Sequence, residues 1–142
     1  MTTVINCILL IDDDAVTNMI HKKAIEKAHC AKQIQVVSSA EEALLYLTRD
    51  GKYEDVELYP APNLIFLDIN MPGLSGWDFL EEFKNLSEDI RQTLIIVMLS
   101  TSMNPDDAEK ARTIKEVSGF KNKPLTIDML DGIISDYFTE KI

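Results

Sequence analysis

Short hydrophobic runs alternate along this chain with stretches in which apolar residues recur at helical spacing. The runs occupy residues 4–11, 34–37, 64–67 and 94–99, and a shorter one occupies residues 119–122. A run without polar alternation is typical of a strand covered on both faces, as in a parallel sheet between two layers of helices. The pattern therefore predicts five parallel strands.

A helix is predicted after each strand, because each polar stretch carries an apolar stripe. Ser39 and Glu42 form a Ser-x-x-Glu capping box, which indicates a helix start. Asn104 before Pro105 indicates another start, and Thr126 can cap the last helix. We expect the following residues to form the inner faces: Val16, Ile20, Ala24 and Ala28; Ala43, Leu44 and Leu47; Trp77, Leu80, Phe83 and Leu86; Ala108, Ala111, Ile114 and Val117; Ile127, Leu130, Ile133, Ile134 and Tyr137.

This alternation predicts an α/β fold in which helices cover both faces of the sheet. Crossovers between parallel strands are right-handed, so a doubly wound (βα)5 flavodoxin-like sandwich with strand order 2-1-3-4-5 is expected. Residues 49–63 are polar, include Gly51, Pro60 and Pro62, and show no sustained period. We expect them to form an exposed connection, whose length favours an insertion that could serve as a contact surface.

Composition narrows the class of protein. The chain has 142 residues, enough for one core, so residues 1–142 are predicted to be a single domain without an output domain. A net charge of −10 opposes direct binding to nucleic acid or to an anionic membrane. No leader pattern or membrane-spanning run is evident, so a cytoplasmic location is expected. Cys7 and Cys30 lack zinc-site spacing and are expected to be free thiols.

Polar side chains follow the predicted strands at the points where these strands end. Asp12 and Asp13 follow the first strand, and Asp68 follows the third. Ser100 follows the fourth strand, and Lys123 follows the fifth. In open α/β sheets, ligands bind at the carboxyl ends of strands, beside the switch point between strands one and three. Three close carboxylates raise one another's pKa unless they share a proton or a cation, and an all-oxygen ligand set favours Mg²⁺.

A magnesium ion beside Asp68, with Ser100 and Lys123 opposite, would form a pocket for a phosphoryl group. A carboxylate oxygen can attack phosphorus when metal and ammonium charges stabilise the transition state. Asp68 is then the nucleophile, and Asp12 and Asp13 hold the metal. Taken singly, the acids could cap a helix, and the lysine and serine could be ordinary surface and strand-end residues. The combination favours the site.

With these motifs in this order, the whole chain resembles the CheY-like receiver domains of two-component response regulators. The resemblance rests on Ile11-Asp12-Asp13, on Leu67-Asp68-Ile69-Asn70-Met71-Pro72 followed by Gly76, on Leu99-Ser100, and on Lys123-Pro124. It implies phosphorylation of Asp68. It also implies that Asp13, Asp68 and the backbone carbonyl of Asn70 bind Mg²⁺, or Mn²⁺ in its place, directly, and that Asp12 binds it through water.

The resemblance further implies a switch. Ser100 would rotate to hydrogen-bond one phosphoryl oxygen, Lys123 would pair with another, and Phe120 would move inward. The bond between Lys123 and Pro124 would be cis. Thr101 leaves the hydroxyl assignment open by one residue, and Ser100 is preferred because it directly follows the strand. Thr101 is also bulkier than the very small residue that many relatives have, which would narrow access to the phosphoryl group. Phe120 lacks a tyrosine hydroxyl, so the switch would work by packing.

The implied partners are proteins. The phosphoryl donor would be a sensor histidine kinase or a histidine phosphotransfer protein. Phosphorylation would bias a two-state surface made of the helix after Asn104, the strand 119–122 and the helix after Thr126. That surface would bind a downstream protein target, or a second copy of the chain in a dimer.

Two other functions stay open. The first is a degenerate receiver used only for dimerisation, against which the complete set of acids argues. The second is a Mg²⁺-dependent aspartyl-phosphate phosphatase, which needs a general acid two residues after the nucleophile, where Asn70 stands. His21 is expected on the polar surface of the first helix, away from the pocket. Trp77 is expected in the core or lining a groove rather than in a cofactor site.

Overall fold

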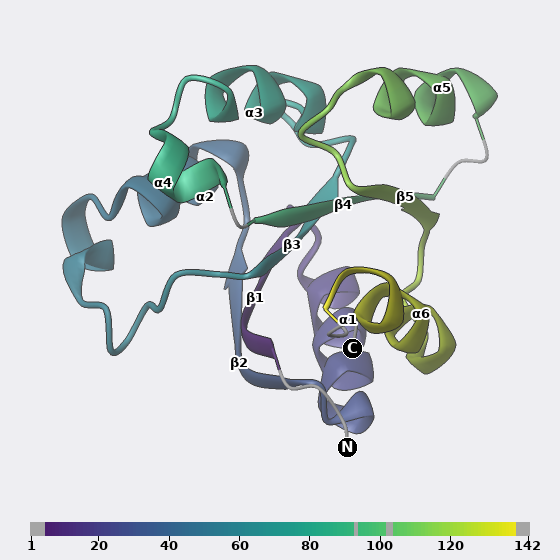
Figure 1. Ribbon diagram of the computed structural model, residues 1–142, viewed down its shortest axis with the longest axis horizontal. Coiled ribbons are helices and arrows are strands. Elements are labelled where there is room, and N and C mark those ends of the chain that lie inside the picture. The colour runs from purple at the N-terminus through teal and green to yellow at the C-terminus, as the bar shows by residue number, and fades with distance from the viewer. Residues whose placement is uncertain (1–4, 93, 102–103, 139–142) are drawn as a thin grey trace.

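Five parallel strands form one sheet in the computed structural model, which describes residues 5–92, 94–101 and 104–138. The strands are β1 (Ile5–Ile11), β2 (Ala31–Val37), β3 (Leu64–Asp68), β4 (Ile95–Ser100) and β5 (Gly119–Asn122). They pair in the order β2-β1-β3-β4-β5, which confirms the predicted flavodoxin-like topology (Figure 1). Val4, predicted at the start of the first strand, lies outside the described residues.

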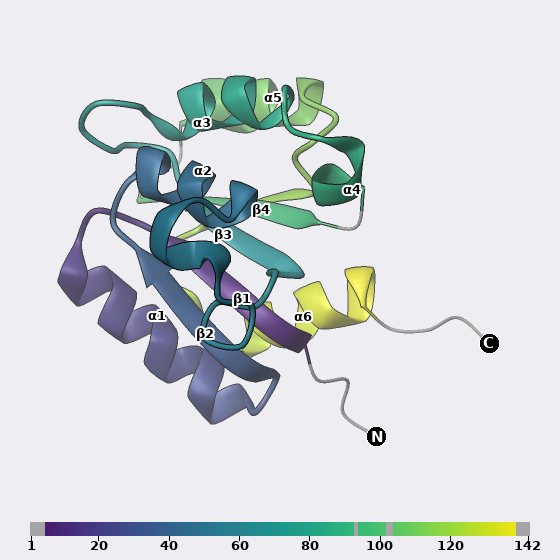
Figure 2. The ribbon, with the colours of Figure 1, turned by 90° about the vertical axis from the view of Figure 1, so that its left-hand side faces the viewer.

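Helices cover both faces of this sheet. One face is covered by α1 (Ala15–Ala28) and α6 (Ile127–Tyr137), and the other by α2 (Ala40–Thr48), α3 (Gly76–Phe83) and α5 (Pro105–Thr113) (Figures 1 and 2). A short additional helix, α4 (Glu88–Arg91), precedes β4 and was not expected from the sequence. A single turn is too short to show a helical period, which explains why the pattern does not reveal it.

The predicted capping residues begin their helices as expected. Ser39 accepts a hydrogen bond from the backbone N–H of Glu42, 3.1 Å away. Asn104 and Thr126 cap α5 and α6 in the same manner. Asp14 caps α1 by accepting the backbone N–H of Val16. These local bonds satisfy backbone donors that the first helical turn leaves free, so each helix begins at a defined residue.

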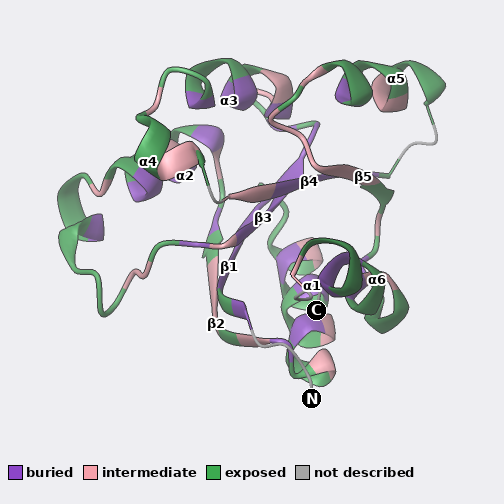
Figure 3. Cartoon of the chain, in the orientation of Figure 1, coloured by how far each residue is buried: buried purple, intermediate pink, exposed green. Residues whose placement is uncertain are grey.

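The sheet separates two hydrophobic clusters. Leu9, Ile65 and Phe79 belong to the cluster under α2 and α3, whereas Ile8 and Phe66 belong to the one under α1 and α6. Successive side chains of a strand point to opposite faces, so a strand in contact with both clusters must be apolar throughout. All of β3 is buried, and it carries Asp68 at its carboxyl end (Figure 3).

The inner face of α1 differs from the predicted one. Val16 and Ile20 are 62% and 49% exposed, whereas Asn18, His21 and Ile25 are buried. The expectation for Val16 and Ile20 is therefore wrong. Apolar spacing identifies a stripe but not which stripe meets the sheet, and here polar contacts at the start of α1 hold the other stripe inward.

The inner face predicted for α6 is right in its middle and wrong at its ends. Leu130, Ile133 and Ile134 are buried, as expected. Ile127 and Tyr137, at the first and last turns, are 42% and 38% exposed. The apolar stripe of α6 is therefore longer than its buried face.

The connection between α2 and β3 is only partly the exposed loop that was predicted. It contains a 3₁₀ turn, Gly51–Glu54, in which Tyr53 is 5% exposed. The ring of Tyr53 contacts those of Tyr46 and Tyr59, with centroids 5.0 and 4.9 Å apart. These aromatic contacts have no period along the sequence, so the pattern misses them, yet they anchor the connection to α2.

Candidate functional site

The register of the sheet brings four strand ends to one edge. Asp12 and Asp68 directly follow two residues that pair between β1 and β3. Ser100 directly follows the residue of β4 that pairs with Asp68. Lys123 directly follows the residue of β5 that pairs with Ser100. The structure therefore places these four predicted site residues together at the switch point between β1 and β3, where α/β sheets bind ligands.

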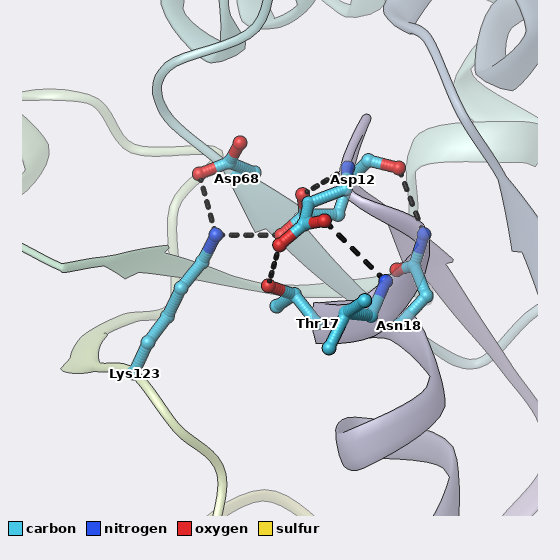
Figure 4. A network of polar contacts seen from close by, with 7 residues as sticks. Asp12, Thr17, Asn18, Asp68 and Lys123 are labelled. Carbon is cyan, nitrogen blue, oxygen red and sulfur yellow. Dashed lines mark hydrogen bonds and ion pairs between the residues drawn. The ribbon is translucent and has the colours of Figure 1, made fainter.

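Lys123 joins the two buried acids of the site. Its Nζ atom lies 2.6 Å from Oδ2 of Asp12 and 3.0 Å from Oδ1 of Asp68 (Figure 4). The three side chains are only 5–9% exposed. One ammonium group neutralises one of the two carboxylates, so a buried negative charge is left at the strand ends. Buried charge is costly unless it is paired, which favours a functional role and a further cation.

The surroundings shift the ionisation of this pair. Burial raises the pKa of Asp68, the Asp12 carboxylate raises it further, and the bond from Lys123 opposes both. Burial alone would lower the pKa of Lys123, but its bonds to Asp12 and Asp68 outweigh burial and raise that pKa. Lys123 is therefore a stable cation in the site.

Three carboxylates of the site are arranged so that they could hold a metal ion. Asp12, Asp13 and Asp68 each offer one oxygen, and these oxygens lie within 4.8 Å of one another. Asp13 is exposed beside the two buried acids. Hard oxygen donors fit Mg²⁺ or Mn²⁺, and Mg²⁺ usually keeps several waters besides one or two carboxylates. The donor set therefore fits the expected metal. Asn70, predicted to add its backbone carbonyl, is exposed two residues after Asp68.

Gly76 allows the chain after β3 to pass close to the backbone of Asp68. A Cβ atom at this position would lie 2.6 Å from the carbonyl oxygen of Asp68, closer than real contacts allow. The Gly76 N–H also donates to the carbonyl of Ile69, 2.9 Å away. The glycine that follows the Asp68 motif in the sequence therefore has a steric reason: backbone must pass directly beside the acid.

The hydroxyl and switch residues occupy different surroundings. Ser100 is fully buried at the end of β4, and its carbonyl accepts the N–H of Lys123 at 2.8 Å, whereas Thr101 is exposed. The peptide bond from Lys123 to Pro124 is cis. Phe120 is half-buried on β5 and lines a cavity of about 380 Å³ together with residues at the start of α5.

Two residues of α1 belong to the site and were not recognised as such from the sequence. His21 is 1% exposed and lines a cavity of about 280 Å³ with Lys123 and Pro124, so the prediction of a surface position away from the pocket is wrong. Burial lowers its pKa, Lys123 lowers it further, and Asp12 acts in the opposite direction. Asn18 donates from Nδ2 to the backbone carbonyl of Asp12 at 2.9 Å. The available signal was an asparagine inside a helix, where its propensity is poor.

These features define a doubly wound α/β domain with an acidic, lysine-containing pocket at its switch point. The family model described as the response regulator receiver domain matches residues 8–135, and the chain belongs to this family of signalling domains. The resemblance drawn from the motifs is thereby confirmed. Among the described residues, no helix is both long and apolar enough to cross a membrane.

Individual relatives agree with this assignment. The response regulator Rcp1 of Synechocystis sp. is 30% identical over 100 residues, which cover 70% of this chain and 65% of that protein. This chain spans about half to two thirds of the length of such curated relatives. A two-component response regulator from Cytophaga hutchinsonii is 34% identical, with a TM-score of 0.83 over 96% of this chain and 99% of that one.

Two further solved structures are of a metal-bound and a phosphorylated protein. The Mn²⁺-bound form of a response regulator Rcp1 is 26% identical, with a TM-score of 0.74 over 96% of this chain and 98% of that one. The phosphorylated cyanobacterial phytochrome response regulator RcpA is 26% identical, with a TM-score of 0.76 over 96% of each chain.

Proposed function

We propose that this receiver domain accepts a phosphoryl group on Asp68 in a Mg²⁺-dependent reaction and then signals by docking to another protein. The observation that carries the proposal is the position of Lys123 Nζ, 2.6 Å from Asp12 and 3.0 Å from Asp68. A cation and two metal-binding acids thus surround a carboxylate at a strand end. The phosphorylated state of RcpA and the Mn²⁺-bound state of Rcp1 support the same chemistry here.

In the proposed reaction, an oxygen of Asp68 attacks phosphorus while the bond from phosphorus to the donor's imidazole nitrogen breaks. The electron pair of that bond stays on the nitrogen, and Asp68 becomes an acyl phosphate. The ammonium group of Lys123 pairs with one phosphoryl oxygen, and the hydroxyl of Ser100 donates to another. Both groups stabilise charge on the equatorial oxygens of the transition state.

The acids would also hold the metal. Asp13, Asp68 and the backbone carbonyl of Asn70 are the proposed direct ligands, and Asp12 acts through a water molecule. Bound Mg²⁺, or Mn²⁺ in its place, supplies positive charge to the phosphoryl oxygens and offsets the negative charge that Lys123 leaves unpaired.

The proposed donor is a phosphohistidine on a sensor histidine kinase or on a histidine phosphotransfer protein. Val16, Met19 and Ile20 of α1 are 49–62% exposed, and Ile20 lines the cavity beside Lys123. Exposed apolar residues grouped on one helix are typical of protein-binding surfaces. They support the approach of a protein donor from the α1 side of the pocket.

The signal is proposed to leave through α5, β5 and α6, towards a downstream protein or a second copy of the chain. Phe120 lies within this surface, and an inward movement of its ring would change the packing between β5 and α5. Because the ring carries no hydroxyl, this change is a matter of shape and not of a new hydrogen bond.

The test is incubation of the protein with Mg²⁺ and acetyl phosphate, read by intact mass. We expect one phosphoryl group on the wild type, lost in mild base and retained in acid, and none on Asp68→Asn. Asp14→Asn is the matched control, because Asp14 belongs to the same run of acids but caps α1 and can do so as asparagine. A chelator added before the phosphodonor should also prevent labelling.

Other results would favour other functions. A wild type that takes up no phosphoryl group would contradict the proposal and favour a receiver used for dimerisation alone. Sustained hydrolysis of acetyl phosphate, far beyond one equivalent, would instead favour a phosphatase. The exposed amide side chain of Asn70, two residues after the nucleophile, is a poor general acid and argues against that activity.

A further inference from the structure

Helix α1 places polar side chains where a helix usually places apolar ones. Asn18 and His21 are 6% and 1% exposed on the face towards the sheet, while Val16, Met19 and Ile20 point outward. Burying an amide in place of a hydrocarbon destabilises a protein unless every polar atom is paired. Asn18 does not meet that condition, since its Oδ1 atom has no hydrogen-bond partner among the described residues. The residue therefore calls for an explanation other than stability.

The other half of the same amide supplies that explanation. Nδ2 of Asn18 donates to the backbone carbonyl of Asp12 at 2.9 Å, within the buried interior (Figure 4). A carbonyl can only accept, so this bond requires the NH₂ group and fixes which way the amide points. The acceptor belongs to a residue of the site itself, directly after β1.

The hydrogen bond from Asn18 affects both Asp12 and Asp13, because its acceptor belongs to the peptide unit that joins them. The Asp12 carbonyl lies in the planar peptide unit that joins Cα of Asp12 to Cα of Asp13. A bond that fixes this plane therefore sets the starting positions of both side chains. At this point the chain has left the β1 ladder and α1 has not yet begun, so helical bonds do not hold the plane.

The remaining polar groups of Asp12 are already held by other residues. Its N–H donates to the carbonyl of Val37 in β2, at 3.2 Å. Its Oδ1 accepts the N–H of Asp14 at 2.9 Å, and its Oδ2 accepts from Lys123 at 2.6 Å. The carbonyl is the one group that Asn18 secures, so the acid is held at every polar atom.

We propose that Asn18 is a positioning residue of the metal site, which sets the Asp12–Asp13 peptide plane through its hydrogen bond to the Asp12 carbonyl. The inference rests on one part of the proposed function, the binding of Mg²⁺ at this site. It does not depend on the transfer of a phosphoryl group to Asp68. Outer partners that orient metal ligands typically contribute about 10–100-fold to metal affinity. Asn18 acts through the backbone, so the lower end of that range is expected.

The test compares Mg²⁺ affinity, measured by calorimetry, with the midpoint of thermal unfolding. Asn18→Leu keeps the shape of the side chain and removes the donor. We expect its Mg²⁺ dissociation constant to rise about tenfold, while its unfolding midpoint stays close to the wild type, because the variant leaves the Asp12 carbonyl unpaired but also removes the unpaired Oδ1 of Asn18. Asn18→Ala removes the donor with less bulk, and Asn18→Gln retains an amide that can restore part of the affinity. A purely structural role would lower stability and affinity together.

Ile25→Val is the matched control. Ile25 is buried on the same face of α1 and has no polar side-chain group to offer the site. Its variant should lose some stability with unchanged Mg²⁺ affinity. In metal-free protein, the amide NMR signal of Asp13 should shift in Asn18→Leu and remain in place in Ile25→Val, since that N–H shares the peptide plane with the Asp12 carbonyl.

Two results would overturn the inference: Mg²⁺ affinity within about twofold of wild type in folded Asn18→Leu and Asn18→Ala, or an equal loss of affinity in Ile25→Val. Failure of the proposed function looks different. A wild type that binds Mg²⁺ but takes up no phosphoryl group would contradict the phosphoacceptor proposal. The role of Asn18 would then still be tested by the same Mg²⁺ titration.

Discussion

Helices α1 and α3 each follow a strand that leads to a site acid, but α3 buries apolar side chains whereas α1 buries polar ones as well. α3 packs Phe79, Leu80 and Phe83 against the sheet. The rings of Phe79 and Phe83 stack with centroids 5.9 Å apart. α1 buries Asn18 and His21 beside Ile25 and leaves Val16, Met19 and Ile20 exposed. The apolar face of α3 is typical of a helix that packs on a hydrophobic core.

The difference shows that the polar contacts of a site can contribute, beside apolar packing, to the orientation of a helix. In α3, the capping box at Ser75 and the apolar face agree, so one orientation satisfies both. In α1, Asn18 is held inward by its bond to Asp12, and Val16 and Ile20 are left exposed. Trp77 marks the outer limit of the α3 face: it is half-buried, with Lys110 Nζ 4.5 Å above its ring, and is packed against the core as expected.

Truncation of the α3 core should have the largest effect. Phe79→Ala removes a fully buried ring and leaves a cavity, so we expect the free energy of unfolding to fall by about 3–5 kcal/mol. Urea denaturation with an unchanged m-value measures it. The control Glu82→Ala, exposed on the same helix, should stay within about 0.5 kcal/mol of the wild type. A loss below 1 kcal/mol, on the order of an average surface change, would show that α3 does not anchor the core.

The buried imidazole of α1 should give an intermediate, pH-dependent effect. Burial lowers the pKa of His21 in the folded protein, so below the ordinary value of about 6.5 the unfolded chain binds a proton more readily. Its contribution to stability is therefore present at neutral pH and lost as the pH falls. His21→Phe keeps a ring that cannot titrate, and its unfolding free energy should fall less steeply between about pH 7 and pH 5.

Burial and Lys123 lower the pKa of His21 while Asp12 acts against them, so this effect should be smaller than that of the cavity left by Phe79→Ala. His29→Asn serves as the control, because His29 is exposed at the end of α1 and has a left-handed backbone that asparagine tolerates. Parallel pH profiles for the wild type and His21→Phe would mean that this imidazole does not respond to burial.

The outward stripe of α1 should give the smallest effect. Ile20 is 49% exposed, so Ile20→Ala should change the unfolding free energy by no more than about 0.5 kcal/mol. The same type of truncation would cost several times more on the inner face of α3. If urea denaturation showed a loss above about 1.5 kcal/mol, the stripe would be structural and the contrast between the helices would fail.

Much of the fold could be predicted because most strands are runs of apolar residues bounded by polar or turn-forming residues. Such runs are readable one at a time, and the crossover rule then restricts the ways in which they can be joined. The short helix α4 and the tyrosine contacts of residues 46–59 could not be read in this way. One is shorter than a helical period, and the other depends on contacts across a loop.

The candidate site was readable for a related reason. Asp12, Asp68, Ser100 and Lys123 each stand at the end of a run, and parallel strands bring such ends to one edge. Their assembly needed no long-range information beyond the strand direction. Asn18 and His21 sit inside a helix, where the sequence gives no indication of which side faces the sheet.

By itself, then, the sequence determined where the strands lie to within a few residues and which polar groups stand at their ends, although β2 begins at Ala31, three residues before the predicted run. These properties are local, since they depend on neighbours within a few positions of the chain. Only the tertiary structure decided how α1 is rotated, that Lys123 lies between Asp12 and Asp68, and that Asn18 supports the first of these acids. Those features depend on distances between segments far apart in the chain, which packing and buried polar contacts set together.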